Sequence, residues 1–232
     1  MILLRSILTP ITIPLSLVYG CIIYLRNLFY DLGWFTTEDF KLPIISVGNI
    51  TTGGSGKTPL VMYLANLLIK NGKNPGIVSR GYGRKSQGLV VVHDGKKMKA
   101  KVESTGDEPF LIASILKSVP VIVCEDRREA IRHLLNSSKV NIIIMDDGFQ
   151  HRRVKRDLDI ITISANDSKN DYRLLPWGKL REPFKNINRS NAIVFTKTDN
   201  YTPPNMLAEL QSAFKGTSIA SSIIPVLMRY DS

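Results

Sequence analysis

The residues best suited to chemistry in this sequence are a glycine-rich run, Thr51-Thr52-Gly53-Gly54-Ser55-Gly56-Lys57-Thr58. Glycines let backbone N–H groups converge on an anion without obstruction by a Cβ atom, and a helix that begins here adds partial positive charge. Lys57 can then reach β- and γ-phosphates, while Thr58 offers a hydroxyl to Mg²⁺. The pattern G-x-x-x-x-G-K-[ST] would have glycine where this chain has Thr51, so the run predicts a variant phosphate-binding loop. A glycine-rich turn that happens to precede a lysine is the alternative.

Two adjacent carboxylates, Asp146 and Asp147, directly follow the apolar run 141–145. A phosphate-binding loop needs an acidic residue at the end of a neighbouring strand to hold magnesium. Carboxylates beside a buried strand are costly as structure and useful as metal ligands. We therefore expect Thr58, Asp146 and Asp147 to hold Mg²⁺, and a solvated Asp-Asp-Gly turn is the alternative.

From residue 42 onward, short apolar runs alternate with segments of helical periodicity. The run 42–47 predicts a strand before the loop, and 59–70 predicts a helix after it, with Pro59 where a helix tolerates proline. This alternation indicates an α/β fold with a mostly parallel sheet covered by helices on both faces. The other expected strands are 75–79, 89–92 (one arm of a small hairpin), 119–124, 141–145, 158–163, 191–195 and 219–227. The other expected helices are 107–116, 127–135 and 204–214.

The N-terminal segment has a different character, because no charged residue lies between Arg5 and Arg26. The run 6–25 is long enough to cross a bilayer as a helix, although Pro10 and Pro14 weaken it as a straight spanning helix. Aromatic residues of the kind that settle at a membrane interface follow it. We prefer an in-plane or partly inserted anchor. The alternatives are a secretory signal peptide, a spanning helix, and a helix packed on the protein's own core.

Composition bounds these interpretations without choosing among them. The 232 residues are 44% hydrophobic, which suffices for a buried core. Two cysteines suggest neither a disulfide framework nor a zinc site. The net charge of +11 favours an anionic partner, which is a nucleotide, a nucleic acid or an acidic lipid. Nucleic-acid binding is the weaker alternative, because the basic run 151–156 lacks interleaved aromatic residues.

Several further motifs accompany the loop and the aspartate pair. Taken together and in this order, they resemble the tetraacyldisaccharide 4'-kinase family. They are Val47-Gly48-Asn49, Ser79-Arg80-Gly81-Tyr82-Gly83-Arg84, Gly106-Asp107-Glu108-Pro109, Asp126-Arg127, Asp146-Asp147-Gly148-Phe149-Gln150-His151-Arg152-Arg153, Asp157-Leu158-Asp159-Ile160 and Leu175-Pro176-Trp177-Gly178-Lys179-Leu180-Arg181-Glu182-Pro183.

This resemblance implies a P-loop kinase that uses ATP and Mg²⁺. Its acceptor would be the 4'-hydroxyl of a tetraacylated glucosamine disaccharide 1-phosphate, a lipid A precursor. The implied location is the cytoplasmic face of the bacterial inner membrane. The implied partners are the lipid disaccharide and the anionic membrane surface, with no nucleic acid and no protein partner.

The resemblance also assigns residues. Asp107 matches the catalytic base, with Lys57, Asp147, His151 and Arg181 completing the catalytic set. Residue type alone leaves Asp107 as a helix N-cap, His151 as a structural histidine, and arginines as surface charges or phosphate clamps. The nucleotide-binding residues are expected to be Thr51, Thr52, Gly53, Gly54, Ser55, Gly56, Lys57 and Thr58. The further residues that match positions lining the site are Tyr82, Arg127 and Glu182, and Glu108 stands beside Asp107.

We expect two parts in the chain, a hydrophobic membrane-associating segment at 1–35 and a P-loop kinase domain at 36–232. Family members continue into a C-terminal portion that carries a histidine paired with the catalytic aspartate, so the domain is expected to be truncated and its activity alone is in question. Another P-loop enzyme such as a GTPase is the main alternative, because Thr196-Lys197-Thr198-Asp199 partly matches N-K-x-D. Comparing ATP with GTP binding separates the two.

Overall fold

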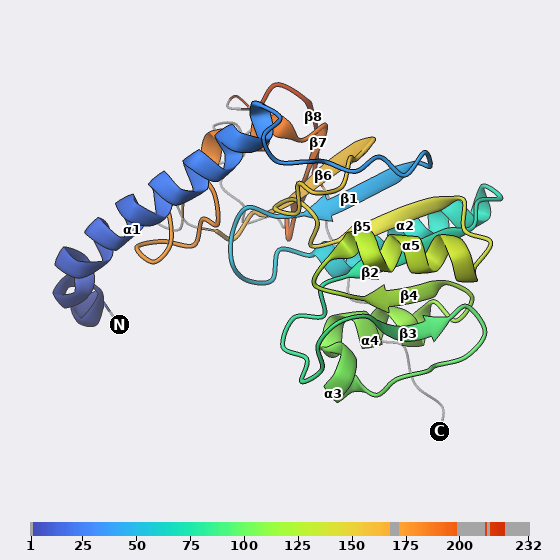
Figure 1. Ribbon diagram of the computed structural model, residues 1–232. Helices are drawn as coiled ribbons and strands as arrows, with labels where there is room; N and C mark the ends of the chain where they lie inside the picture. Colours follow the sequence, from blue (N-terminus) through green and yellow to red (C-terminus); the bar gives the residue numbers. More distant parts are fainter. Residues whose placement is uncertain (1, 168–171, 199–211, 213, 221–232) are drawn as a thin grey trace.

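The computed structural model describes residues 2–167, 172–198, 212 and 214–220. Their strands form one eight-stranded sheet in the order β3-β4-β2-β5-β1-β6-β7-β8 (Figure 1). All neighbours are parallel except β3 and β4. The strands are β1 (Ile44–Gly48), β2 (Pro75–Ser79), β3 (Val90–Asp94), β4 (Pro120–Val123), β5 (Ile142–Asp146), β6 (Leu158–Ser164), β7 (Ala192–Thr196) and β8 (Thr217–Ala220).

Helices cover both faces of this sheet, as the alternating pattern predicts. α2 and α4 pack on one face around Val47, Ile77 and Ile144, and α5 packs on the other around Val78, Ile122 and Ile143. Every residue of β2, β4 and β5 is buried, as in parallel strands with two covered faces. The helices are α1 (Ile2–Asp31), α2 (Lys57–Lys70), α3 (Val102–Thr105), α4 (Asp107–Ile115), α5 (Arg127–Ser137) and the 3-10 helix η2 (Phe184–Arg189).

The α/β fold class and the elements around the loop are confirmed, with bounds that shift by one or two residues. The arm expected at 89–92 becomes β3, which bridges from His93 to Met98 in a short hairpin and also pairs with β4 at the edge of the sheet. Neither α3 nor η2 was predicted. The helix expected at 204–214 lies almost entirely outside the described residues. Of the strand expected at 219–227, only residues 219 and 220 are described, and they belong to β8.

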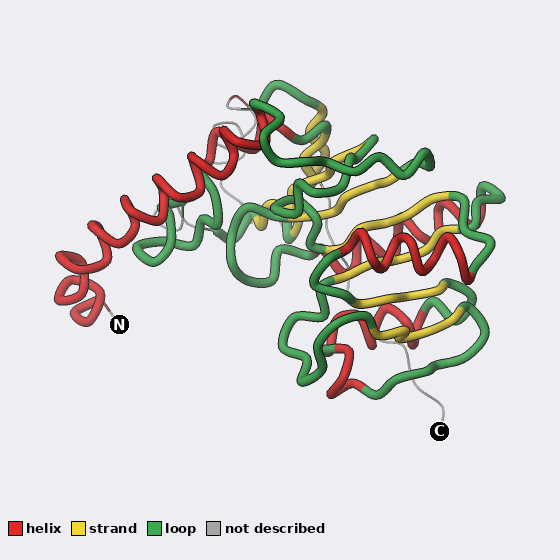
Figure 2. The backbone as a smooth tube through the Cα atoms, viewed as in Figure 1, coloured by secondary structure: helices red, strands yellow, loops and turns green. Residues whose placement is uncertain are grey.

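α1 extends away from the sheet domain as a long arm (Figure 2). It continues through Pro10 and Pro14 and bends near its N-terminal end, so the prolines deflect the helix without ending it. The part from Thr9 to Asp31 is long and apolar enough to cross a membrane by length and composition, and only 11% of its most apolar window is buried. This exposure argues against a helix packed on the protein's own core.

Candidate functional site

The phosphate-loop candidate connects the end of β1 to the start of α2. Gly56 precedes the helix in the left-handed conformation (φ 78°), and Gly53 also has a positive φ of 115°. Only glycine adopts such angles without strain. A Cβ atom on Gly53 or Gly54 would meet nothing within 4 Å, so this part of the loop faces open space. Because the first amides of α2 lack intrahelical acceptors, they are available to an anion there.

Hydroxyl groups of the neighbouring strands β6 and β7 hold the loop through hydrogen bonds to Ser55. The Ser55 hydroxyl lies 2.8 Å from Asn49 Nδ2 and 2.8 Å from Thr162 Oγ1 on β6. The Thr196 hydroxyl, at the end of β7, donates to the Ser55 carbonyl (2.9 Å), and Lys197 Nζ donates to the Gly54 carbonyl (2.7 Å). With these carbonyls bound to the protein, the loop's amides can face outward. Asp199 of the partial N-K-x-D match lies outside the described residues.

The first two residues of the expected binding run have a supporting position. The Thr52 amide donates to the Lys179 carbonyl (2.8 Å), and Thr51 forms an isolated bridge with Leu180. The Arg181 amide donates to the Ile50 carbonyl (2.8 Å). The Thr52 amide is therefore already used within the protein, and the outward-facing part of the run begins at Gly53.

Asp147 is the charged centre of the site. Its Oδ1 lies 3.6 Å from Lys57 Nζ, and Arg181 Nη1 donates to both carboxylate oxygens (3.0 and 3.1 Å). The residue has a positive φ of 51°, and buried Arg127 binds its carbonyl oxygen (3.1 Å). Burial pushes the pKa of Asp147 upward, but the charges of Lys57 and Arg181 outweigh it and hold the pKa below its usual range. Asp147 is thus an ionised carboxylate beside the loop.

Asp146 has the opposite electrostatic character although it is the next residue. It is 1% exposed, its Oδ2 accepts a hydrogen bond from Ser79 (2.9 Å), and its buried Oδ1 has no hydrogen-bond partner among the described residues. Burial raises the pKa of Asp146 to about 6, and the charges of Asp147 and Glu108 add to the effect. A buried oxygen without a partner beside an ionised carboxylate fits a cation ligand.

No group of three or more His, Cys, Asp or Glu side chains that could hold a metal occurs within the described part of the chain. A cation beside Asp146 would therefore need other oxygens, such as a threonine hydroxyl, water or phosphate. Thr58 lies in the first turn of α2, where the sequence predicts such a ligand.

Close packing at two glycines brings the aspartates beside the loop. A Cβ on Gly48, the last residue of β1, would lie 2.5 Å from Phe149 Cβ. A Cβ on Gly148 would lie 2.7 Å from Ser46 Oγ. Such distances exclude any side chain, so both motifs require glycine for the ends of β1 and β5 to approach.

Asp107 opens α4 as its first residue. The N-cap is Gly106, with φ 85° and no side-chain cap bond, so the interpretation of Asp107 as the N-cap is wrong. A Cβ on Gly106 would lie 2.6 Å from the Tyr82 carbonyl oxygen, which brings the segment after β2 against this helix start. Asp107 and Glu108 are exposed, and the charge of Glu108 acts on Asp146. The structure therefore gathers Asp107, Glu108 and Tyr82 at one corner of the site.

His151 lies next to Asp126, at the start of α5, with 3.8 Å between Nε2 and Oδ1. Its Nε2 is buried without a hydrogen-bond partner among the described residues. Burial, followed by the charge of Arg127, lowers the pKa of His151 to about 3, so the imidazole is neutral near pH 7. Arg127 itself is 5% exposed and binds two backbone carbonyls, those of Glu125 and Asp147, so it is not a surface charge.

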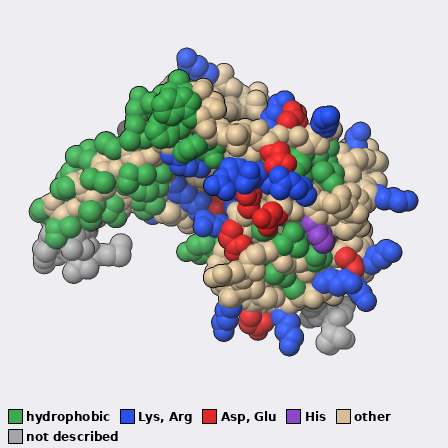
Figure 3. All heavy atoms as spheres, viewed as in Figure 1, with side chains coloured by type: hydrophobic (Ala, Val, Ile, Leu, Met, Phe, Trp, Pro, Cys, Tyr) green, Lys and Arg blue, Asp and Glu red, His purple; other side chains and the backbone are tan. Residues whose placement is uncertain are grey.

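The basic run 151–156 is used for internal ion pairs. Arg152 pairs with Asp31 (2.6 Å), Lys155 with Asp39 (2.7 Å) and Arg156 with Asp159 (3.0 Å). This use favours a structural role over a nucleic-acid surface. Lys and Arg side chains gather where α1 meets the sheet domain, and hydrophobic side chains cover α1 beside them (Figure 3).

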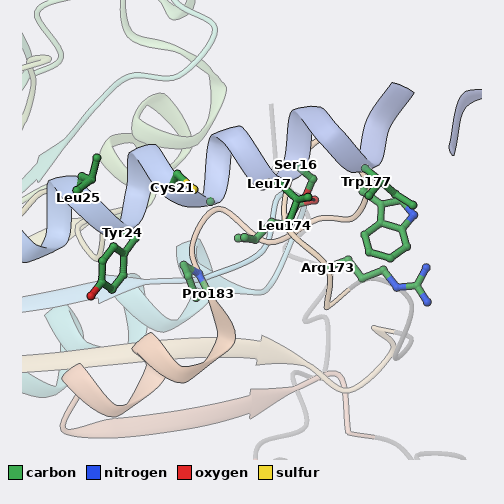
Figure 4. A pocket seen from close by; sticks show the side chains of 11 residues that line it. Ser16, Leu17, Cys21, Tyr24, Leu25, Arg173, Leu174, Trp177 and Pro183 are labelled. Atoms are coloured by element: carbon green, nitrogen blue, oxygen red, sulfur yellow. Dashed lines mark hydrogen bonds between the residues drawn. The ribbon is translucent and has the colours of Figure 1, made fainter. Parts of the chain in front are cut away.

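An apolar groove of about 580 Å³ lies between α1 and the segment 173–183. Leu17, Cys21 and Tyr24 line it from the helix, and Leu174 and Pro183 face them from the segment (Figure 4). The guanidinium of Arg173 stacks 4.1 Å from the ring of Trp177 at its edge. The same segment binds the start of the phosphate loop through the Lys179 carbonyl. The groove and the phosphate loop therefore lie on one shared segment.

The sequence as a whole is similar to those of known proteins. The family model described as tetraacyldisaccharide-1-P 4'-kinase matches residues 8–225. The tetraacyldisaccharide 4'-kinase of Aquifex aeolicus is 46% identical over 184 residues, which cover 79% of this chain and 57% of the relative. That of Desulfotalea psychrophila is 42% identical over 193 residues, which cover 83% of this chain and 56% of the relative.

A solved structure is also similar, the crystal structure of LpxK from Aquifex aeolicus in complex with ATP. It superposes with a TM-score of 0.78 at 44% identity, covering 86% of this chain and 61% of that chain. The present chain thus spans less than two thirds of the length of these relatives.

Proposed function

Since this chain belongs to the tetraacyldisaccharide-1-P 4'-kinase family, we propose that it forms the nucleotide-binding part of a lipid kinase. The reaction is transfer of the γ-phosphate of ATP to the 4'-hydroxyl of a tetraacyldisaccharide 1-phosphate. The single observation that carries the proposal is the 3.6 Å approach of Lys57 to Asp147 beside an open glycine loop. This pairing of a phosphate-binding lysine with an acidic residue from the adjacent strand is what phosphoryl transfer requires.

The loop from Gly53 to Thr58 binds the terminal phosphates through its amides and through Lys57. The hydroxyls of Thr162 and Thr196 support this role, because they bind the hydroxyl and the carbonyl of Ser55 and so hold the loop in its conformation. Thr51 and Thr52 hold the loop to residues 179–180. When the nucleotide leaves, Lys57 still has Asp147 as a partner, so its charge remains compensated.

Thr58, Asp146 and Asp147 would hold magnesium, which neutralises phosphate charge when it is bound. The unpartnered Oδ1 of Asp146 supports this assignment. Asp147 is ionised at neutral pH, and Arg181 and Lys57 keep its carboxylate oriented toward the loop. Arg127 holds the strained backbone of Asp147 in place.

Asp107 accepts the proton of the acceptor hydroxyl. Its exposure at the start of α4 supports this role, because a general base must reach a hydroxyl on an incoming substrate. His151 is neutral, and its unpartnered Nε2 is buried 3.8 Å from Asp126 Oδ1, so it supports the site from within the protein. Tyr82 and Glu108 lie beside Asp107 and line the acceptor side, while Glu182 is buried and fixes the segment that carries Arg181.

Residues 1–35 form the membrane-associating segment, and 36–232 belong to the kinase domain. The exposed apolar side chains of α1, among them Ile11 and Leu17, support attachment to a bilayer. The net charge of +11 supports an anionic inner-membrane surface at its cytoplasmic face. We favour a helix that lies in the interface, because residues 16–31 contact the kinase domain along their length.

A phosphate-transfer assay tests the proposal. The chain, and a longer form extended to the length of its relatives, are incubated with γ-labelled ATP and the lipid disaccharide 1-phosphate in mixed micelles. We expect labelled lipid with ATP and about 100-fold less with Asp107→Asn, which keeps its nucleotide affinity. Preference for GTP, or transfer that survives Asp107→Asn, would contradict the assigned chemistry.

A further inference from the structure

A short segment, Lys179–Glu182, lies between the phosphate loop and α1. On the loop side, the Lys179 carbonyl accepts from the Thr52 amide, and the Arg181 amide donates to the Ile50 carbonyl, both at 2.8 Å. On the other side, the Tyr19 hydroxyl of α1 donates to the Arg181 carbonyl (2.7 Å). Arg181 thus contacts Ile50 between β1 and the loop, Tyr19 of the anchor helix and, through its guanidinium, Asp147.

A second contact from the same helix reaches the next residue. Glu182 is fully buried, and its Oε2 accepts hydrogen bonds from Asn27 of α1 (3.1 Å), from Asn186 (2.9 Å) and from Arg189 (2.7 Å). Asn27 is itself only 7% exposed. A buried amide and a buried carboxylate are costly unless they bind each other, so this contact fixes α1 against the segment in one register.

A third contact of α1 leads through Gln150 to Asn49 and the phosphate loop. Arg26 of α1 donates to the Gln150 carbonyl, and the Gln150 side chain donates to the Asn49 carbonyl (2.9 Å). Asn49 in turn binds the Ser55 hydroxyl within the loop. Two separate chains of hydrogen bonds therefore run from α1 to the phosphate loop, one through Arg181 and one through Gln150.

The contacts follow the helical repeat of α1. Ser16, Tyr19 and Asn27 share one face, and the Ser16 hydroxyl also binds the Leu174 carbonyl (3.0 Å). At Gly20 on this face a Cβ atom would lie 2.9 Å from Leu174 Cδ1, so the helix approaches the segment closely. A helix that served only as an anchor would not need buried polar side chains on the face toward its own domain.

We propose that α1 is a positioning element of the nucleotide site as well as an anchor. Tyr19 and Asn27 are its positioning residues: they hold Lys179–Glu182, and that segment holds the phosphate loop and the Arg181 guanidinium in place. The inference rests on the proposed binding of nucleotide phosphates at that loop. As a consequence, the loop keeps a fixed distance from whatever surface the outer face of α1 contacts.

The test is a titration of the full chain in detergent micelles with a fluorescent ATP analogue and Mg²⁺. Tyr19→Phe removes one hydroxyl and keeps the ring, and we expect about threefold weaker nucleotide affinity. Adding Asn27→Ala should bring the loss to about tenfold. Tyr24→Phe is the matched control, because it removes the same hydroxyl from the same helix at a position that is 53% exposed; its affinity should equal that of the wild type.

Two further measurements separate positioning from general stability. The unfolding temperature and the partitioning into vesicles of phosphatidylethanolamine and phosphatidylglycerol are measured for the same variants. At a temperature where the protein is fully folded, Tyr19→Phe should weaken nucleotide affinity without changing partitioning into the vesicles. Wild-type binding with equal affinity in Tyr19→Phe and the double variant would overturn this inference alone. No nucleotide binding by the wild type would overturn the proposed function and this inference with it.

Discussion

The sheet domain and α1 distribute their polar and apolar side chains in opposite ways. In the sheet domain, β-branched residues fill the interior and charged groups collect at the ends of the strands, where Lys57 meets Asp147. In α1, Leu17 is 67% exposed while Asn27 is 7% exposed. One region is built for an aqueous exterior and the other for an apolar one. The polar face of α1 is directed at the protein, so the two regions meet through hydrogen bonds at the nucleotide site.

The largest effect should come from the polar end of the sheet. Lys57→Ala removes the charge that faces Asp147 and the expected phosphates, and it should lower phosphate transfer about 100- to 1000-fold. Lys70→Ala, in the last turn of the same helix and exposed, is the control and should retain full transfer. If Lys57→Ala kept wild-type transfer, the charged residues at the strand ends of the sheet domain would not carry the chemistry.

The second prediction concerns pH and the sheet domain alone. Because the pKa of His151 is about 3 in the folded chain and about 6.5 when unfolded, its neutral form stabilises the fold above pH 6.5. As pH falls from 6.5 to 5, this contribution should decrease by about 2 kcal/mol. Denaturant unfolding at both pH values should show a smaller decrease for His151→Gln than for the wild type. The raised pKa of Asp146 acts with the opposite sign but equally in both proteins.

His133→Gln is the control for this pH effect, since it removes a different imidazole from α5. It should follow the wild-type pH dependence. If His151→Gln and His133→Gln respond identically, the burial of His151 has no energetic consequence.

The third prediction addresses the apolar side of the comparison. Leu17→Asn places an amide on the exposed face of α1 and should weaken partitioning into anionic vesicles about tenfold. Leu135→Asn on α5 is the matched control, because Leu135 is also exposed (39%) but belongs to the sheet domain. Vesicle flotation measures both. Equal loss in the two variants would show that α1 has no special relation to the bilayer.

The smallest effect should come from the support behind the loop. Thr196→Val keeps the shape of the side chain and removes the hydroxyl that binds the Ser55 carbonyl, so nucleotide affinity should fall about threefold. Thr217→Val on the neighbouring strand β8 is the control, because that threonine is exposed. An unchanged affinity in Thr196→Val would mean that the loop holds its conformation without β7.

Local patterns predicted most of the fold. β2 at 75–79 was predicted at its observed bounds, because a short apolar run between polar residues is typical of a buried parallel strand. The phosphate loop followed from glycine spacing and from its position between a strand and a helix. η2 escaped prediction, because six residues are too few for a period to be recognised.

The parts of the site that depend on distant contacts could not be predicted. Thr162 and Thr196 are polar residues inside apolar strands, and nothing in the sequence indicates that both reach Ser55. Buried Glu182 accepts a hydrogen bond from Asn27, which lies 155 residues away in the sequence. Residue type suggests Asp107 as a helix N-cap because aspartate is common there, but α4 begins at Asp107 and its N-cap is Gly106.

The central claim is that the loop and the aspartates act together on a nucleotide with its magnesium. Calorimetric titration of the full chain with a non-hydrolysable ATP analogue, with and without Mg²⁺, tests it most directly. We predict saturable binding with one nucleotide per chain, strengthened by Mg²⁺ in the wild type but not in Asp147→Ala. Binding that is absent in the wild type, or equally strengthened by Mg²⁺ in Asp147→Ala, would contradict the claim.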